Sequence, residues 1–206
     1  MSQPLSAMHE SNTLPLLNTH GLEHADARLC EKRIDGKRAF DGVLMKVNVD
    51  QVSLPDGSTA IREYTKHPGA VMIIPIFSDG SILLERQYRY PIGQTLIEFP
   101  AGKLDPNETA LECARRELLE ETGYYAHTLE YLTRINPVIS YSTEHIEIFI
   151  ARDLEQREAH LDAGEFLEIF RTTPECLLQW VKEGSVPDVK TQIGAFWLEK
   201  ILARQW

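Results

Sequence analysis

The stretch from Gly102 to Tyr124, GKLDPNETALECARRELLEETGY, constrains the fold of this chain most, because it joins helix boundary signals to a dense group of carboxylates. Asp105 followed three residues later by Glu108 has the form of a capping box, and Pro106 stands at the first helical position. Gly123 supplies a C-terminal stop. These signals predict a helix that begins at about Pro106 and ends just before the glycine.

The predicted helix, residues 106–122, has an apolar stripe and an acidic face. Apolar side chains recur at steps of three and four residues and form the stripe, which consists of Leu111, Ala114 and Leu118. Three carboxylates at the same kind of spacing form the neighbouring face, namely Glu117, Glu120 and Glu121. Three like charges therefore meet on one face.

Like charges at this spacing destabilise a helix, and no lysine lies one turn away to neutralise them. Hard divalent cations take oxygen ligands, and Mg²⁺ in proteins is held by carboxylates together with substrate phosphates. One interpretation of the face is thus a Mg²⁺ or Mn²⁺ site. The other is a solvated acidic helix surface, and the face alone does not separate the two.

The surroundings favour the first interpretation. Residues 102–124 match the fixed spacings of a known signature. The matching positions are Gly102, Glu108, the run Arg116-Glu117-Leu118, the pair Glu120-Glu121 and Gly123. In these positions the chain resembles the Nudix hydrolases, which split nucleoside diphosphates linked to another group. Tyr124 departs from the signature, where the family more often has an aliphatic residue.

The resemblance implies an α/β Nudix fold, an α/β/α sandwich with a mixed sheet, over residues 67–206. It also implies that the Ala101 carbonyl joins Glu117, Glu120 and Glu121 as a metal ligand, because Gly102 lets the backbone pass close to a ligand. Glu98, in the segment Glu98–Gly102, is implied to support substrate binding. Arg116 is expected to orient the glutamates through a salt bridge rather than to touch substrate.

Composition allows one substantial core in 206 residues, of which 43% are hydrophobic and 25% charged. The net charge of −10 argues against nonspecific binding to nucleic acid or to anionic membranes. It also repels an anionic substrate, so bound cations and placed arginines must supply the local attraction. Three widely spaced cysteines and the lack of a secretory or membrane-spanning segment favour a cytoplasmic protein.

Residues 1–25 lack periodicity, and we expect this segment to be loosely ordered. Residues 26–66 contain short runs typical of strands at 28–33, 42–52 and 59–66, with a hairpin marked by Asp56-Gly57. So small an antiparallel β-domain cannot bury a core alone. In the ADP-ribose pyrophosphatase branch of the Nudix family a comparable sheet is exchanged between subunits, which implies a homodimer here.

Several residues outside the helix are candidates for substrate binding. Phe40 could stack on a base, although core or interface packing is the more ordinary use of such a side chain. Arg62 and Arg89 occupy places similar to the substrate-binding arginines of ADP-ribose pyrophosphatases, and a guanidinium matches phosphate oxygens bidentately. Exposed salt bridges are the alternative for each, as they are for Arg86.

The remaining strands are predicted at 67–77 and 82–91, paired as a hairpin, and at 128–136, 145–152 and 166–171. The polar loop 153–165 precedes the last strand. In related enzymes a glutamate of this loop acts as general base, and Glu165 matches it best, whereas alternation assigns Glu168 to the strand. A solvated acidic loop is the alternative.

Two C-terminal helices are predicted. The first follows a capping-box pattern from Thr172 to Glu175, with Pro174 in its first turn, and ends at Gly184. The second runs from about 188 to 204, with one apolar side assigned to the core: Ile193, Phe196, Trp197 and Ile201.

These observations together predict a metal-dependent diphosphatase that converts ADP-ribose or a related ADP-sugar into AMP and a sugar phosphate. About two or three Mg²⁺ ions, or Mn²⁺, would bridge the diphosphate and activate a water whose proton Glu165 removes. Glu120 and Glu121 belong to this catalytic group. Two alternatives stay open, namely a diphosphatase for GDP-mannose or another nucleoside diphosphate sugar, and a non-catalytic nucleotide-sensing Nudix module.

The sequence does not decide the preferred base and sugar. The loop 136–144, with Pro137, is longer than the corresponding loop of the ADP-ribose-hydrolysing members to which it is similar.

Overall fold

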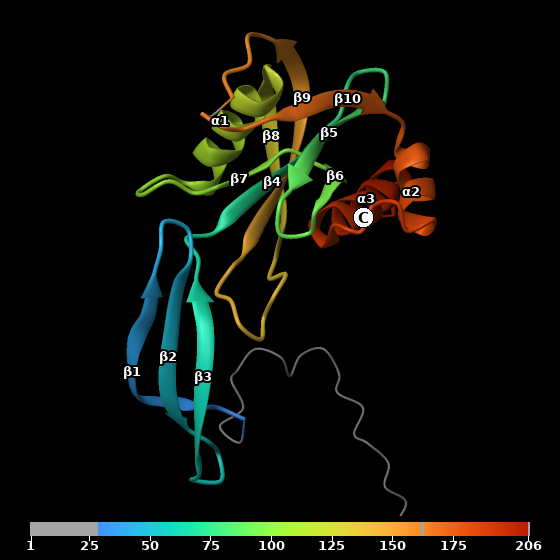
Figure 1. Cartoon of the computed structure of the whole chain (residues 1–206). Coiled ribbons are helices and arrows are strands. Elements are labelled where there is room, and N and C mark those ends of the chain that lie inside the picture. The colour runs from blue at the N-terminus through green and yellow to red at the C-terminus, as the bar shows by residue number, and fades with distance from the viewer. Residues whose placement is uncertain (1–28, 162, 206) are drawn as a thin grey trace, which may run out of the picture. The chain divides into compact units, whose positions relative to one another are not determined.

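The computed structural model describes residues 29–161 and 163–205. The predicted loosely ordered segment, residues 1–25, lies outside them. The first three strands form an antiparallel sheet in the order β1-β2-β3 (Figure 1). They are β1 (Lys32–Asp41), β2 (Lys46–Ser53) and β3 (Thr59–Lys66). The third strand agrees with its predicted range. The first begins later than predicted, and the second begins later because the chain bends at 43–44.

The central sheet has four strands in the order β7-β4-β9-β8. They are β4 (Ala70–Pro75), β7 (Ala101–Lys103), β8 (Tyr124–Ile135) and β9 (Ile146–Gln156). The β4–β9 pair is parallel and the other pairs are antiparallel, so the sheet is mixed, as predicted. All six residues of β4 are buried, which is typical of a strand covered on both faces.

A second sheet has the order β10-β5-β6, built from β5 (Ile82–Arg89), β6 (Gln94–Glu98) and β10 (Leu167–Thr172). The predicted hairpin of residues 67–77 and 82–91 is therefore wrong, because β4 and β5 belong to different sheets. Only an isolated bridge, Ile76 to Ile82, joins them. Both edges of β4 are taken by β7 and β9, so β5 pairs elsewhere.

Helices lie on both faces of the central sheet, which confirms the α/β/α sandwich (Figure 1). Helix α1 (Ala110–Thr122) packs Cys113, Ala114 and Leu118 on the β4 side chains of Val71 and Ile73. The opposite face, with Met72 and Ile74, belongs to a core shared with β5 and with helices α2 (Pro174–Lys182) and α3 (Val189–Leu202).

Helix α1 begins four residues later than predicted. Its N-cap is Thr109, which forms a capping box with Glu112. Asp105 and Glu108 do bond to each other, but they close a turn ahead of the helix. Asn107 has a φ of 68°, and this left-handed backbone prevents a helix from running through it. Gly123 ends the helix in the left-handed conformation, as predicted.

The buried faces of the helices agree with the predicted ones in part. On α1, Ala114 and Leu118 are buried as predicted together with Cys113, but Leu111 is 46% exposed. On α3, Ile193 and Ile201 pack against the core as predicted, but Phe196 is 47% exposed, and the fully buried positions are Thr191, Gly194, Ala195 and Leu198. Small residues let this helix approach the core closely, so the larger aromatic ring faces outward. Thr173, rather than Thr172, caps α2.

None of the helices among residues 29–161 and 163–205 is both long enough and apolar enough to cross a membrane. The cytoplasmic location stays a prediction.

Candidate active site

Strand β7 and helix α1 approach each other closely at Gly102. A Cβ atom built on Gly102 would lie 1.8 Å from Cδ of Glu117, so any larger residue would displace that carboxylate. The neighbouring Ala101 amide donates a hydrogen bond to Oε2 of Glu121 at 3.1 Å. The glycine expected to allow a close approach therefore makes room for a glutamate of the helix. The Ala101 carbonyl as a metal ligand stays a prediction.

Arg116 connects the carboxylates at the solvent side of α1. Its guanidinium bonds Glu108 through two nitrogens at 2.8 Å each, Glu117 at 2.8 Å and Glu120 at 3.0 Å. The predicted salt bridge between Arg116 and the glutamates is confirmed. No lysine lies one turn away, but this arginine of the same helix pairs with the acidic face. We call Arg116, Glu108, Glu117 and Glu120 the Arg116 cluster.

The Arg116 cluster shifts the pKa values of its members. Hydrogen bonding from Arg116 lowers the pKa of Glu108 to about 2. The same bonds, first of all the one to Glu108, raise the pKa of Arg116. Burial raises the pKa of Glu117, although Arg116 opposes the shift. On the side of the helix toward Glu108, each of the three carboxylates thus has Arg116 as a cationic partner, although one positive charge serves three negative ones.

Glu121 is in a different environment. Its side chain is buried, and within the described parts of the chain no ion pair reaches it. Burial and then the charges of Glu85, Glu117 and Glu165 raise its pKa. Glu121 therefore faces other carboxylates without a cationic partner.

Glu85, which sequence reasoning missed, is one of these carboxylates. It lies on β5 opposite Glu98 of β6, is 1% exposed, and neither of its carboxylate oxygens has a hydrogen-bond partner. Burial and then the charge of Glu98 raise its pKa. A glutamate directly after the buried run Ile82–Leu84 was a signal that could have identified it.

Arg89 and Glu98, both predicted to bind substrate, are paired with each other. Nε and Nη2 of Arg89 bond the two oxygens of Glu98 at 2.7 and 2.8 Å. Lys190 of α3 also pairs with Glu98, and it pairs with Asp188 at 3.0 Å. Burial disfavours the charged form of Glu98, but these cations outweigh it and hold its pKa below the usual value. Sequence reasoning missed Lys190 and Asp188, because only the fold brings α3 to β6.

Glu165 is brought to the same group of carboxylates. Gln87 of β5 donates a hydrogen bond to its Oε1 at 3.0 Å, and its charge acts on Glu85, Glu117 and Glu121. Glu168 lies on β10 as predicted, exposed and paired with Arg86 at 3.3 Å. Arg86 thus forms the exposed salt bridge that was its alternative. The role of Glu165 as general base stays a prediction.

Phe40 and Arg62 lie on β1 and β3, and both are exposed. Their roles in substrate binding stay predictions.

The carboxylates fit a hard divalent cation by their chemistry. Within the described residues, no three His, Cys, Asp or Glu side chains are already arranged as a complete ligand set. The two unpartnered oxygens of Glu85 and the uncompensated Glu121 nevertheless supply oxygen donors in a buried, negatively charged place. Mg²⁺ and Mn²⁺ prefer such donors.

The fold and the site define the class of protein: an α/β/α sandwich in which a glycine segment and a carboxylate-bearing helix lie beside buried glutamates of a second sheet. The model of the NUDIX domain matches residues 66–191. The chain belongs to the Nudix family and is a hydrolase similar to ADP-ribose pyrophosphatases.

Two curated relatives are similar over most of their length. The chain is 38% identical to a methanol dehydrogenase activator of Bacillus methanolicus, over 82% of this chain and 92% of that one. It is 36% identical to an ADP-ribose pyrophosphatase of Bacillus subtilis, with the same coverage. A crystal structure of an ADP compounds hydrolase has a TM-score of 0.77 at 24% identity, covering 85% of this chain and 95% of that one, which shows the fold.

Proposed function

We propose that this Nudix hydrolase splits the diphosphate of ADP-ribose or a related ADP-sugar, giving AMP and a sugar phosphate. The observation that carries the proposal is the group of carboxylates that α1, β5 and the loop before β10 bring together: Glu85, Glu117, Glu121 and Glu165. The relatives named as ADP-ribose pyrophosphatases, at 36% and 34% identity, support the choice of substrate.

Glu117, Glu120 and Glu121, with the Ala101 carbonyl, would hold about two or three Mg²⁺ or Mn²⁺ ions. Bound there, such ions would screen the diphosphate charge and lower the pKa of a water. The side chains of the protein then have separate roles. Arg116 fixes the orientation of Glu117 and Glu120 through its bonds to both.

Glu165 would accept the proton of the attacking water. Its bond from Gln87 holds one carboxylate oxygen and leaves the other for the proton. Glu98, which is itself paired with Lys190, holds Arg89 at the end of β5, where its guanidinium would bind the substrate. Arg62 and Phe40 of the N-terminal sheet would complete the site at a phosphate and at the base.

A diphosphatase for GDP-mannose is the second candidate, supported by a relative named GDP-mannose pyrophosphatase at 28% identity. The name of the Bacillus methanolicus relative states an effect on a dehydrogenase and does not separate the two candidates. A purely nucleotide-sensing role is disfavoured by the intact set of glutamates on α1.

Parallel assays with ADP-ribose, ADP-glucose and GDP-mannose, in Mg²⁺ or Mn²⁺, test the proposal through the nucleoside monophosphate released. We expect AMP from ADP-ribose at the highest kcat/KM, and no product after chelation by EDTA. A higher kcat/KM with GDP-mannose would favour the second candidate. No release from any of these substrates would contradict a diphosphatase function.

We also propose a homodimer formed through residues 26–66. The three-stranded sheet and the bend between β1 and β2 expose several large apolar side chains, which a single chain leaves in water: Ile34, Phe40, Val43, Leu44, Met45 and Ile61. Light scattering should give twice the chain mass of 23.5 kDa. A monomeric mass at micromolar concentration would contradict the dimer.

A further inference from the structure

Glu85 is a buried carboxylate whose desolvation no hydrogen bond or bonded ion pair of the described residues offsets. Its side chain is 1% exposed, and both carboxylate oxygens lack a hydrogen-bond partner. A buried polar group without a partner costs about 1–3 kcal/mol, and more when it is charged. Protonation would not remove this cost, because the neutral carboxyl also needs partners for its oxygens. A bound cation, directly or through its water, would supply these oxygens with a partner.

The charges around Glu85 come from five parts of the chain. Glu98 on β6, Glu165 in the loop before β10 and Glu121 on α1 are the negative neighbours. Arg89 of β5 and Lys190 of α3 are the positive neighbours, and both are already bound to Glu98. These two cations therefore act on Glu85 only at a distance, and among the described residues neither bonds its carboxylate oxygens.

Glu85 also links the parts of the site. It is the neighbouring charge that acts most strongly on Glu121, while its strand neighbour in register is Glu98. It thus lies between the carboxylates of α1, which the proposed function assigns to cations, and the Arg89–Glu98 pair, which it assigns to substrate.

We propose that Glu85 is a further carboxylate of the cation site, which a bound divalent cation, directly or through its water, supplies with the missing partner. The inference rests on the proposed function, since it assumes the cations held by Glu117, Glu120 and Glu121. Glu85 raises the affinity of the site for those cations, and the metal-free protein carries the energetic cost of the unpartnered carboxylate.

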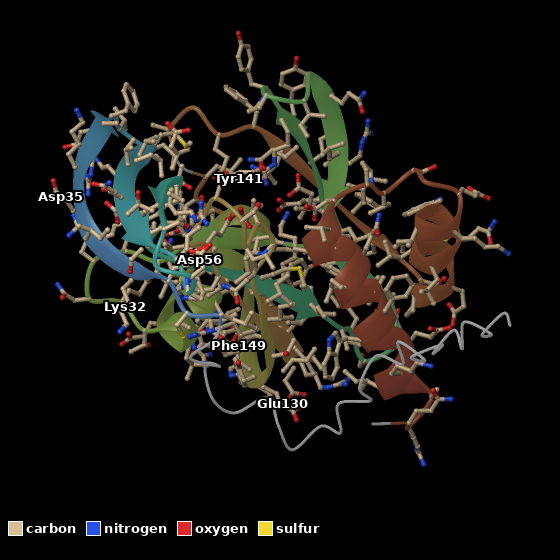
Figure 2. All side chains as sticks on the ribbon, turned by 90° about the horizontal axis from the view of Figure 1, so that it is seen from below. Lys32, Asp35, Asp56, Glu130, Tyr141 and Phe149 are labelled. Carbon is tan, nitrogen blue, oxygen red and sulfur yellow. The ribbon has the colours of Figure 1, made fainter. Side chains whose placement is uncertain are left out.

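Binding of Mn²⁺ alone, measured by the electron paramagnetic resonance signal of the free ion, tests this inference without an activity assay. Removing a residue that supports the ligands of a metal typically costs about 10–100-fold in affinity, and we expect a loss of this size for Glu85→Gln. The matched control is Glu130→Gln, because Glu130 is an exposed carboxylate on β8 to which no role in the site is assigned (Figure 2). The control should bind as the unchanged protein does.

The outcomes separate the two proposals. If the unchanged protein takes up no Mn²⁺, with or without AMP, the proposed function fails. If it binds Mn²⁺ and Glu85→Gln binds equally well, the inference about Glu85 is overturned while the proposed function stands.

Thermal unfolding of Glu85→Met provides a second test. Methionine has a similar length and no oxygens, so it removes the unpartnered carboxylate without opening a large cavity. We expect a higher Tm than the unchanged protein when both are metal-free, and a smaller rise of Tm on adding Mn²⁺. A lower Tm of metal-free Glu85→Met, or failure of either variant to fold, would show that Glu85 stabilises the metal-free chain and would overturn the inference.

Discussion

The Arg116 cluster and the buried glutamates Glu85 and Glu121 lie in one site, but they solve the problem of like charge differently. In the cluster, one guanidinium bonds Glu108, Glu117 and Glu120. Around Glu85 and Glu121 no such cation is provided by the described residues, and burial raises the pKa of both. The comparison teaches that a high density of carboxylates does not by itself indicate a cation site.

The carboxylates that indicate the cation site most directly are the two without a bonded cationic partner, Glu85 and Glu121. Arg116 belongs to the chain and organises the ligands before any cation arrives. Glu121 and Glu85 are left for a cation to neutralise. Variants around Glu85 and Glu121 should therefore change cation binding and turnover, whereas a variant at Glu108 should mainly change stability.

The largest effect is expected at Glu121. Glu121→Gln removes the charge of a buried carboxylate that has no bonded cationic partner, and kcat should fall at least a hundredfold while the fold is kept. Steady-state kinetics and circular dichroism check this, with Glu130→Gln as the control of equal chemical change. Near-normal turnover of the Glu121 variant would contradict the assignment.

A somewhat smaller loss is expected at Glu165. Removing a general base typically costs about a hundredfold or more in kcat, so Glu165→Gln should lower kcat by about that factor and leave KM nearly unchanged. Glu168→Gln is the matched control, because Glu168 is exposed and bonds Arg86 at the strand. Equal effects of the two substitutions would remove Glu165 from its role.

Gly102→Ala connects the two regions, because its new methyl group takes the place of the Glu117 carboxylate, 1.8 Å away. The end of the glutamate side chain can move, so the fold should survive, while Mn²⁺ affinity falls by about tenfold. Isothermal calorimetry measures the affinity. The double variant Gly102→Ala with Glu117→Gln should bind no more weakly than Glu117→Gln alone, and additive losses would show that the alanine acts by another route.

The smallest effect is expected at Glu108, within the Arg116 cluster. Glu108→Gln should lower the free energy of unfolding by about 1 kcal/mol at pH 7, because the bonds from Arg116 lose their charge. The folded pKa of Glu108 is about 2, below the ordinary 4.5, so its stabilising effect is present above pH 4.5 and is lost as pH falls toward 2.

Urea unfolding at several pH values checks this sign. The difference between the unchanged protein and the variant should shrink as pH falls from about 4.5 toward about 2. A difference that is constant with pH would show that packing, rather than the ion pair, stabilises this turn.

The sequence was sufficient for those parts of the site that depend on local spacing. Glu117, Glu120 and Glu121 share a helix because their spacing along the chain places them there, and Gly123 ends that helix because glycine readily adopts the left-handed conformation found at this position. Arg116 reaches two of these glutamates for the same reason. The Nudix family could thus be assigned from residues 102–124.

Local signals were weaker where two patterns competed. Two capping boxes overlap in residues 105–112, and the left-handed Asn107 decided for the second. Two apolar runs around a turn predicted a hairpin, but the pairing of β4 with β7 and β9 depends on residues far along the chain.

Only the tertiary structure decided which carboxylates have a bonded cationic partner. Glu85 is in a strand, Glu98 in the next, Lys190 in the last helix and Glu165 in a loop, and no spacing along the chain relates them. They meet because two sheets and three helices pack around shared cores. Spacing along a helix determines which side chains share a face, whereas burial and long-range pairing determine whether a charge on that face finds a partner.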